Sequence, residues 1–522
     1  MKHKFPRQFV NQVRWTLTLT ILVSAMLLTG CQQALVLPEF PVQSQSPPYA
    51  NQAALDADLR VLIAAHALTG DPSQGRNLPS IHSPIAQLGK KLFFTKAMGG
   101  DMDVACVSCH HPQLGGGDGL SLSIGVGAHN PDLLGPGRTR PEGTPNVPRN
   151  APTTFNIALW DEVLFWDGRV ESLGKMPGMG GADGMGIRTP DVAFGVADPL
   201  AGDNLAMAQS RFPVTSVDEM RGEAFAADGN NEDVRNQLAK RLSGYRLAGY
   251  GDGLSPHQLT TSAHWLAEFE RVFTALDSEG PLITEQRIAF ALAEYERSQI
   301  FVESPWKAYV QGNDSALSES AKRGAWLFYN DAEAGGANCA SCHTGDFFTD
   351  EQFHTIALPQ IGPGKELNTA FADFGRYRET GNPDDLYTFR TPTLLNVEVT
   401  GPYGHDGAYT TLEGIVRHHL NPIEGCTTYD MAQLDPMIQT EQARANTEAV
   451  MSKLLENREQ GLTAVEDIPL TNSQIDDLVS FLHALTDPCV KDAACLAPWL
   501  PYPGQDNFDT NQLMAQIPSL EN

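Results

Sequence analysis

The chain has 522 residues and a formal net charge of -27, with 47 glycines, 35 prolines and only 19% charged residues. A chain of this length can form two or three domains with proper cores. Its acidity argues against nucleic acid or an anionic lipid surface as a partner. The glycine and proline content favours long ordered loops over long regular elements.

The first thirty residues predict an export signal. A basic segment precedes the apolar run Leu17 to Leu28, and Leu28-Thr29-Gly30-Cys31 resembles a bacterial lipobox. We therefore expect residues 1–30 to be removed and Cys31 to carry a lipid, which anchors the protein without a spanning helix. An ordinary signal peptide is the alternative. Gln32 suggests, by resemblance to lipoprotein sorting signals, the periplasmic face of the outer membrane of a Gram-negative bacterium.

Residues 31–52 are rich in proline, glutamine and serine, which is typical of a tether. We expect folded structure from about Ala53. Ser83 and Pro84 then predict the start of a helix, with serine as its cap and proline in its first turn. The apolar residues that follow, Ile85, Leu88 and Leu92, share one face of this helix.

Two short strings carry the chemistry. In Cys106-Val107-Ser108-Cys109-His110 the two thiols have the spacing that forms thioethers to a haem, and the adjacent histidine ligates the iron. The pattern returns at Cys339-Ala340-Ser341-Cys342-His343, after a second predicted helix that Ser318 opens. The pentads predict two c-type haems, and a zinc site or a structural disulfide is the weaker alternative. Because helix, loop and pentad occur twice, we infer an internal duplication of a cytochrome c-like unit.

These features predict an all-α fold of two cytochrome c-like haem domains with long irregular loops. A helical pattern closes the first domain, which we place at residues 53–312. The second domain, residues 313–488, ends after a helix that starts at Thr471 or Asn472, and residues 489–522 form an irregular arm. The helical pattern of the first domain consists of Ile283, Ile288, Leu292 and Tyr295.

Three cysteines lie outside the pentads and the lipobox. Cys489 and Cys495 are close enough in sequence to close a small disulfide loop in an oxidising compartment, and this is our first expectation. With Cys426 included, three pairings are possible.

Further motifs complete a resemblance to the bacterial di-haem cytochrome c peroxidases, including their MauG-like branch of protein-modifying enzymes. The resemblance extends from about Ser83 to Pro488. Besides the pentads it rests on Arg149-Asn150-Ala151-Pro152-Thr153, Phe165-Trp166-Asp167-Gly168-Arg169 and Gly401-Pro402-Tyr403-Gly404-His405-Asp406-Gly407.

The resemblance implies that Trp166 lies between the two haems and carries electrons between them. It also implies a calcium ion between the haem domains. The calcium ligands would be the side chain of Asn150 and the backbone oxygens of Thr400 and Pro402, completed by water. The alternative is that Asn150 only caps a turn.

The resemblance also places polar residues over the first haem. The family's peroxidatic site has a glutamine, a proline four residues later and a glutamate ten residues after the glutamine, and Gln209, Pro213 and Glu219 keep these intervals. Cleavage of peroxide needs a group that takes a proton from one oxygen and returns it to the other. We expect Glu219 to be this acid and base, and Gln209 to orient peroxide or water.

Two departures from the family concern the first haem. An inserted loop of about thirty extra residues, at about 170–208, contains Met176 and Met179. We expect it to cover the site entrance, with copper binding or sacrificial oxidation of sulfur as alternatives. Val126 follows Ser123-Ile124-Gly125 where classical members have a histidine that blocks the iron. The first haem is therefore expected to be five-coordinate at rest, unless His129 reaches it.

A third departure concerns the second haem. Fourteen residues after the position of His405, classical peroxidases place an axial methionine and the MauG-like branch a tyrosine. Here the same count reaches His419. We expect His343 and His419 to hold the second iron, with His418 as the alternative. Imidazole in place of methionine should lower the haem potential.

Together these features predict an oxidoreductase. The leading hypothesis is a di-haem peroxidase that reduces hydrogen peroxide at the N-terminal haem, with electrons relayed through the bis-histidine haem from a small redox protein. The first alternative is a MauG-like enzyme that uses peroxide to modify a partner protein. The alternative from another class is an electron-transfer cytochrome without catalysis.

Overall fold

The computed structural model describes residues 52–182, 184–225, 230–244, 259, 261–273, 281–365, 371–502 and 509–514. The predicted signal, Cys31 and nearly all of the predicted tether lie outside the described residues. Within the described ranges, no helix is long and apolar enough to cross a membrane.

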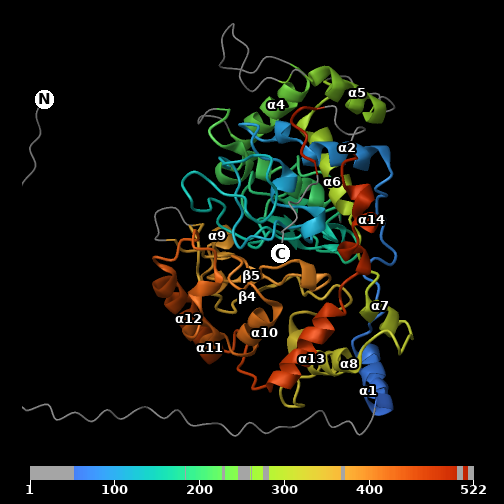
Figure 1. Ribbon diagram of the computed structural model, residues 1–522, viewed down its shortest axis with the longest axis vertical. Coiled ribbons are helices and arrows are strands. Elements are labelled where there is room, and N and C mark those ends of the chain that lie inside the picture. Colours follow the sequence, from blue (N-terminus) through green and yellow to red (C-terminus); the bar gives the residue numbers. More distant parts are fainter. Residues whose placement is uncertain are drawn as a thin grey trace, which may run out of the picture. The chain divides into compact units, whose positions relative to one another are not determined.

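The described chain is mostly helical, with five short strands (Figure 1). The helices are α1 (Gln52–Ala65), α2 (Pro84–Phe94), α3 (Leu205–Ser210), α4 (Asn231–Leu242), α5 (Ser262–Phe273), α6 (Glu285–Arg297), α7 (Pro305–Val310), α8 (Glu319–Tyr329), α9 (Tyr377–Thr380), α10 (Leu412–Leu420), α11 (Pro422–Thr427), α12 (Ala443–Glu459), α13 (Asn472–His483) and α14 (Ala493–Leu496). The strands are β1 (Val163–Leu164), β2 (Val170–Ser172), β3 (Ile187–Arg188), β4 (Phe353–His354) and β5 (Phe389–Arg390).

Side-chain caps start the helices where the sequence predicts them. The Ser83 hydroxyl accepts a hydrogen bond from the Ala86 amide at the start of α2, and Ser318 accepts one from Ala321 at the start of α8. Thr471 begins α13 with a capping box. These three predicted helix starts are confirmed.

Two helix pairs repeat the same close crossing. Helix α2 packs against α6, and α8 packs against α13. A Cβ atom on Gly89 of α2 would lie 1.8 Å from the carbonyl oxygen of Ala291, and one on Gly324 of α8 would lie 1.9 Å from that of Asp477. Only glycine allows backbones to approach this closely. Each glycine lies six residues after its capping serine, so the duplication read from the sequence extends to how the helices pack.

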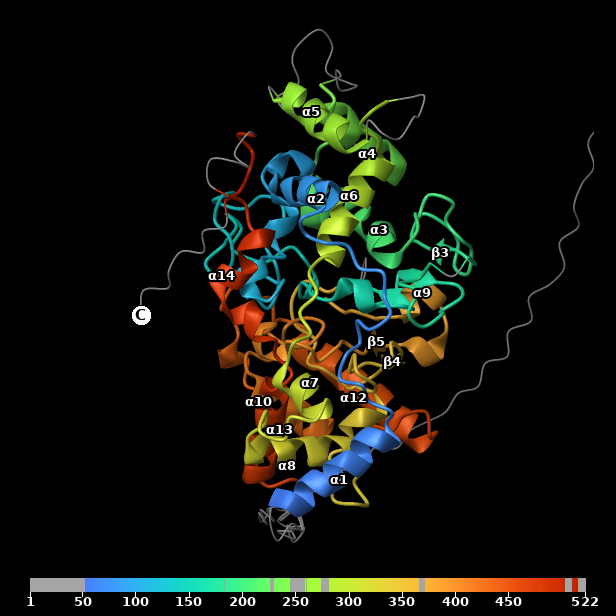
Figure 2. The ribbon, with the colours of Figure 1, turned by 90° about the vertical axis from the view of Figure 1, so that its right-hand side faces the viewer.

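Each helix pair belongs to a different hydrophobic core. Leu88, Leu92 and Tyr295 belong to one core, and Leu327, Phe328 and Phe481 belong to the other. The two pairs lie in opposite halves of the described body, with β4 and β5 between them (Figures 1 and 2).

Helices α1 and α7 pack on the core that contains α8 and α13, although both precede residue 312. Leu55 and Leu59 of α1 and Trp306 of α7 are buried in that core. By chain order these helices belong to the first predicted domain, but they pack in the core of the second. The boundary near residue 312 stays a prediction.

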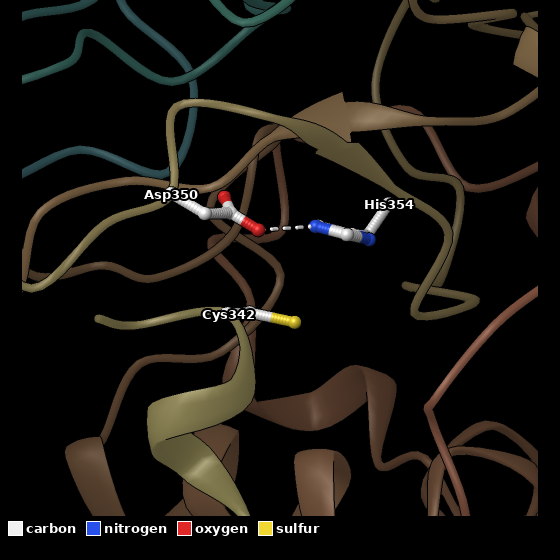
Figure 3. Close-up of side chains that lie close together, drawn as sticks. All are labelled: Cys342, Asp350 and His354. Carbon is white, nitrogen blue, oxygen red and sulfur yellow. Dashed lines mark hydrogen bonds and ion pairs between the residues drawn. The ribbon is translucent and has the colours of Figure 1, made fainter.

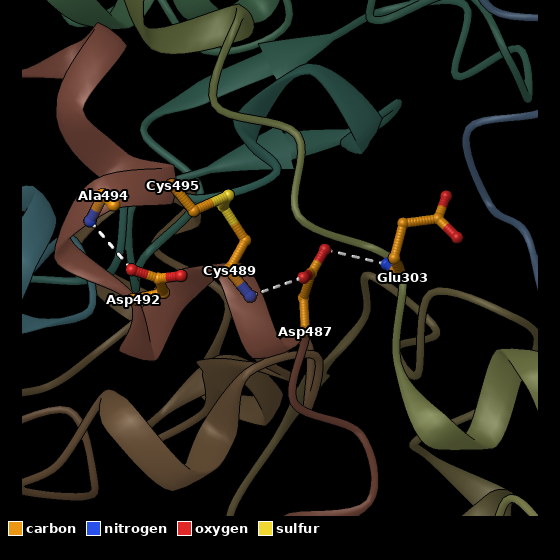
Figure 4. The surroundings of a disulfide bond; sticks show 6 residues. All are labelled: Glu303, Asp487, Cys489, Asp492, Ala494 and Cys495. Carbon is orange, nitrogen blue, oxygen red and sulfur yellow. Dashed lines mark hydrogen bonds between the residues drawn. A yellow bond between two sulfur atoms is a disulfide. The ribbon is translucent and has the colours of Figure 1, made fainter.

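The segment after α13 contains the disulfide. Cys489 and Cys495 are bonded, with their Cα atoms 5.3 Å apart. The Asp487 carboxylate accepts hydrogen bonds from the amides of Cys489 and Glu303, which fixes this loop next to the start of α7 (Figure 4). Cys426 remains a free thiol. Further on, the buried side chain of Leu513 joins the core of α2 and α6.

The inserted loop is anchored at its base. Strands β1, β2 and β3 form a small antiparallel sheet. The Asp161 carboxylate accepts hydrogen bonds from the amides of Gly178 and Gly180, each at 2.7 Å, and pairs with Arg76. Met176 and Met179 are exposed.

Candidate active site

The first pentad lines a cavity together with the residues predicted to face it. Cys106, Cys109 and His110 form part of its wall, and Gln209 and Glu219 form another part. The Nδ1 atom of His110 lies 3.2 Å from the carbonyl oxygen of Gly116. A hydrogen bond at Nδ1 fixes the tautomer and leaves Nε2 for a metal. Of the histidines in the described chain, only His110 lines this cavity.

The polar groups of the first cavity are available to a ligand. Gln209 lies near the end of α3, and its buried Oε1 atom has no hydrogen-bond partner. Glu219 lies on a π-helical turn, Val217–Arg221, that Ser216 caps. The Arg169 guanidinium, which also lines the cavity, lies 3.9 Å from Glu219 Oε1. Both predicted residues therefore border the cavity, next to a cation.

Contacts with residues 123–126 hold the turn that carries Glu219. A Cβ atom on Gly125 would lie 2.0 Å from the carbonyl oxygen of Asp218, so glycine is required there. The Val126 amide donates to the same oxygen at 3.2 Å. Val126 does not line the cavity, and His129 is exposed and does not line it either.

The second pentad lines a second cavity, whose wall also contains His354, His405 and His419. Cys339, Cys342, His343 and His419 all border it. The ring centroids of His343 and His419 are 6.4 Å apart. An imidazole nitrogen binds a first-row metal at about 2 Å, so two rings on opposite sides of one ion have centroids roughly 6 Å apart. The spacing of the pair therefore fits two imidazoles that would hold one metal ion between them.

Hydrogen bonds distinguish His419 from its neighbour His418. Nδ1 of His419 lies 2.8 Å from the Ile415 carbonyl oxygen, which leaves Nε2 for a metal, and Nδ1 of His343 is bonded in the same way to Phe348. Both ring nitrogens of His418 are already bonded, to the Tyr409 hydroxyl and the Ile356 carbonyl oxygen. Of these two neighbours, only His419 has a nitrogen free for a metal.

Trp166 lines both cavities. Its indole N–H donates to the backbone carbonyl oxygen of Asn150 at 3.0 Å. The backbone N–H of Asn150 in turn donates to the carbonyl oxygen of His405. Thr400 and Pro402, the other predicted calcium ligands, line the second cavity, and Asn150 lines both. The structure thus brings three separate motifs together around one indole.

A buried ion-pair network joins the segments on either side of Trp166. Arg149 pairs with Asp167 at 2.5 Å and forms a two-pronged pair with Asp373. Burial alone would raise the pKa of Asp373, but the charge and hydrogen bonds of Arg149 outweigh it and lower the pKa to about 2. Glu351 accepts hydrogen bonds from the amides of residues 161–163. These contacts fix the segment that carries Trp166.

Cys342, Asp350 and His354 form the one cluster of metal-ligand type found among the described His, Cys, Asp and Glu side chains (Figure 3). Asp350 accepts a hydrogen bond from Nε2 of His354 at 2.7 Å. The Cys342 thiol is the second thiol of the pentad, so a thioether would remove it as a metal ligand. The remaining pair is an Asp–His contact beside the haem attachment point.

Three charged residues that sequence reasoning missed also line the cavities. Glu296 and Lys365 line the first cavity and Arg390 lines the second. Burial raises the pKa of Glu296 to about 8, and its Oε2 atom has no partner. Burial, followed by the charges of Arg169 and Arg149, lowers the pKa of Lys365 to about 7. Single charged residues in a helix or loop carry no sequence pattern that reveals a cavity.

The donor sets fit covalent haem. In each cavity two thiols and one histidine with a bonded Nδ1 share a wall, and none of the four pentad cysteines forms a disulfide. A structural disulfide within either pentad is therefore wrong for this fold.

Comparison with known proteins points to one family. A family model described as di-haem cytochrome c peroxidase matches residues 83–315. Over these residues the chain is similar to this family. The similarity implies two c-type haems, in agreement with the two pentads.

Relatives of the chain come from both branches of the di-haem family. The methylamine utilization protein MauG of Methylorubrum extorquens is 28% identical over 333 residues, covering 64% of this chain and 67% of that protein. Cytochrome-c peroxidase IdrP1 of Denitromonas iodatirespirans is 28% identical over 429 residues, 76% of this chain and 90% of that protein. The crystal structure of a MauG-like protein associated with microbial copper homeostasis has the same fold, with a TM-score of 0.50, 22% identity, and coverage of 81% of this chain and 96% of that one.

Proposed function

We propose that the protein is a di-haem peroxidase that reduces hydrogen peroxide in the first cavity with electrons supplied through the second. One observation carries this proposal. The cavities share Trp166, but unbonded polar groups line the first cavity with His110, while a second imidazole lies near His343 in the other. One haem would then be open to an oxidant and the other closed.

In the first cavity the protein's task is proton transfer. A bound haem would supply the iron that breaks the oxygen–oxygen bond of peroxide. Glu219 would take a proton from one peroxide oxygen and deliver it to the other, so that the second leaves as water. The free Oε1 atom of Gln209 would accept a hydrogen bond from peroxide and orient it. Arg169, 3.9 Å from Glu219, would hold the carboxylate toward the cavity.

Between the cavities, Trp166 would carry electrons singly to the first haem. Support comes from its place on both cavity walls and from the hydrogen bond that fixes its indole. His343 and His419 would hold the second iron in both oxidation states, so that it exchanges electrons without binding peroxide. The electron donor would be a small redox protein.

The rival proposal is a MauG-like enzyme that draws its electrons from side chains of a partner protein. Two observations favour it: His419 has the geometry of an axial ligand where classical members have methionine, and MauG proteins are among the relatives. Bis-imidazole ligation lowers the haem potential and favours oxidised iron.

We further infer two cytochrome c-like haem units, around α2 with α6 and around α8 with α13, followed by the arm from residue 489. A calcium ion beside Asn150 fits the same arrangement, because the Asn150 amide nitrogen is bonded to the carbonyl oxygens of Leu120 and Ser121 and its side-chain oxygen is left for a cation. Acylation of Cys31 would hold the enzyme to the outer membrane, in the periplasm.

Turnover of peroxide with candidate reductants tests the function. The peroxidase proposal expects rapid oxidation of a reduced small cytochrome or copper protein by peroxide and the enzyme. Failure to oxidise any such donor, together with peroxide-dependent mass changes in a partner protein, would favour the MauG-like alternative. Haem spectra that peroxide leaves unchanged would contradict both.

A further inference from the structure

Arg390 differs from every other buried arginine in the described chain. The others, which all donate to a carboxylate or a backbone carbonyl, are Arg138, Arg149, Arg188, Arg211, Arg235, Arg241 and Arg376. Arg390 is 4% exposed, and its Nε and Nη1 atoms have no hydrogen-bond partner. A buried charge without a partner costs several kcal/mol, so an anion is expected to join it.

The protein around Arg390 does not supply this anion. The nearest contributing carboxylates are Glu351 and Asp167, and neither forms an ion pair with Arg390. Glu351 is occupied by backbone amides, and Asp167 by Arg149 and Arg169. Burial accordingly lowers the pKa of Arg390 to about 9, against the partial opposition of these two carboxylates.

The fold fixes the position of Arg390 firmly. Arg390 lies on β5, where it pairs with Phe353 of β4. Its backbone N–H donates to the Trp166 carbonyl oxygen at 2.9 Å. The guanidinium carbon lies 3.5 Å from the ring centre of Trp160, which covers one face of the guanidinium. Arg390, Trp160 and Trp166 all line the second cavity. The guanidinium is therefore held ready for a planar anion. Because Nε and Nη1 lie on different edges, a two-pronged pair would use Nη1 and Nη2 at its end.

We propose that Arg390 is a carboxylate-binding residue that forms a two-pronged pair with a propionate of the second haem. The inference rests on this cavity holding a haem, as proposed above. A haem brings two carboxylates and no other anionic group, and the guanidinium fork matches a carboxylate in shape and charge. Arg390 thereby positions the second haem against Trp160 and raises its potential, because it neutralises a negative charge that would stabilise ferric iron.

The test compares Arg390→Gln and Arg390→Lys with the full-length holoprotein. In R390Q the uncompensated propionate should favour the ferric form of the second haem about tenfold, a fall in midpoint potential of about 59 mV for one electron. Its propionate-bending mode in resonance Raman spectra should shift too. R323Q is the matched control, because Arg323 lies in the same half, pairs with Asp477 and does not line the cavity. It should leave both readouts near the wild-type values.

Three outcomes would overturn the inference. One is an R390Q protein with both haems and with a wild-type potential and Raman mode. If R390Q loses its second haem, R390K decides, because a single ammonium cannot reproduce the fork and an unchanged Raman mode would contradict the pair. The third is a wild-type potential that chloride or phosphate shifts until the effect saturates, with no such shift in R390Q. Arg390 would then bind an anion from solvent instead. Absence of a second haem from the wild-type protein would refute the proposed function and not this pair alone.

Discussion

The two haem cavities begin from the same design and differ on the side opposite the pentad histidine. In both, a glycine-mediated helix crossing precedes a pentad, and the pentad histidine donates Nδ1–H to a backbone carbonyl. Gln209 and Glu219 line the first cavity with His110, whereas His419 lines the second with its ring centroid 6.4 Å from that of His343. Under the proposed function, one duplicated unit would thus give a reactive centre and a closed electron carrier through a change in the residues that line the cavity.

Charges sharpen this contrast. The first cavity contains a carboxyl, Glu296, that burial keeps protonated near neutral pH, since its pKa is raised to about 8. The second contains a guanidinium, Arg390, without a protein anion. A proton donor suits a cavity in which peroxide consumes protons, and a fixed cation suits one in which a haem changes oxidation state.

Replacing Glu219 should have the largest effect on activity. Glu219→Gln keeps the size and removes the proton carrier, so peroxide turnover should fall by roughly 100- to 10,000-fold while both haems stay attached. Asp218→Asn is the matched control, since Asp218 is adjacent, exposed and outside the cavity. Stopped-flow mixing with one equivalent of peroxide measures both variants. Equal reactivity of E219Q and wild type would remove the acid–base role and favour a pure electron carrier.

Removing the proposed second ligand of the second haem should make the two cavities alike. His419→Ala removes the proposed second ligand, so the low-spin bis-imidazole signal should disappear from the spectrum of the ferric protein. His418→Ala should keep that signal, because both nitrogens of His418 are bonded within the protein. The reverse pattern would make His418 the ligand.

Removing the buried acid of the first cavity should stabilise the protein at alkaline pH. The folded pKa of Glu296 is raised from 4.5 to about 8, so the folded state keeps a proton that the unfolded state has lost, and stability falls as pH rises between these values. Glu296→Gln avoids this cost and should gain on the order of 2 kcal/mol over wild type between pH 5 and pH 8. Thermal unfolding at both pH values measures the difference. A gain that does not grow with pH would mean that folding does not raise the pKa of Glu296.

The two indoles at the second cavity should differ in their effect on electron transfer. The Arg390 charge lies over Trp160 and disfavours its oxidation, whereas Trp166 borders both cavities. Trp166→Phe should therefore slow electron transfer between the haems by at least about tenfold, equivalent to about 1.4 kcal/mol of barrier. Trp160→Phe should leave it close to wild type. Transient absorption after peroxide addition measures both, and similar rates in the two variants would remove the distinction.

Local patterns were sufficient to predict the covalent chemistry. The pentads, the caps at Ser83, Ser318 and Thr471, and the Cys489–Cys495 pair depend on neighbours in sequence, and the structure confirms these caps and this disulfide. The resemblance to a family added Gln209, Glu219, Trp166 and His419. Each of them lines one or both cavities, and their roles stay predictions.

Features that depend on long-range packing were not predictable. The attachment of α1 to the core around α8 follows from burial of Leu55 and Leu59 against residues more than 250 positions away. The described residues of the inserted loop line neither cavity, which gives no support to the expectation that they cover the site entrance. Arg390 and Glu296 could be recognised only from the structure, because each is buried and has side-chain atoms without a hydrogen-bond partner.

Electron paramagnetic resonance of the resting ferric protein tests the division between the cavities most directly. An open first haem and a second haem held by His343 and His419 predict one high-spin signal and one low-spin signal of bis-imidazole type, in equal amounts. Two low-spin signals, or a low-spin signal with a sulfur ligand, would contradict this account.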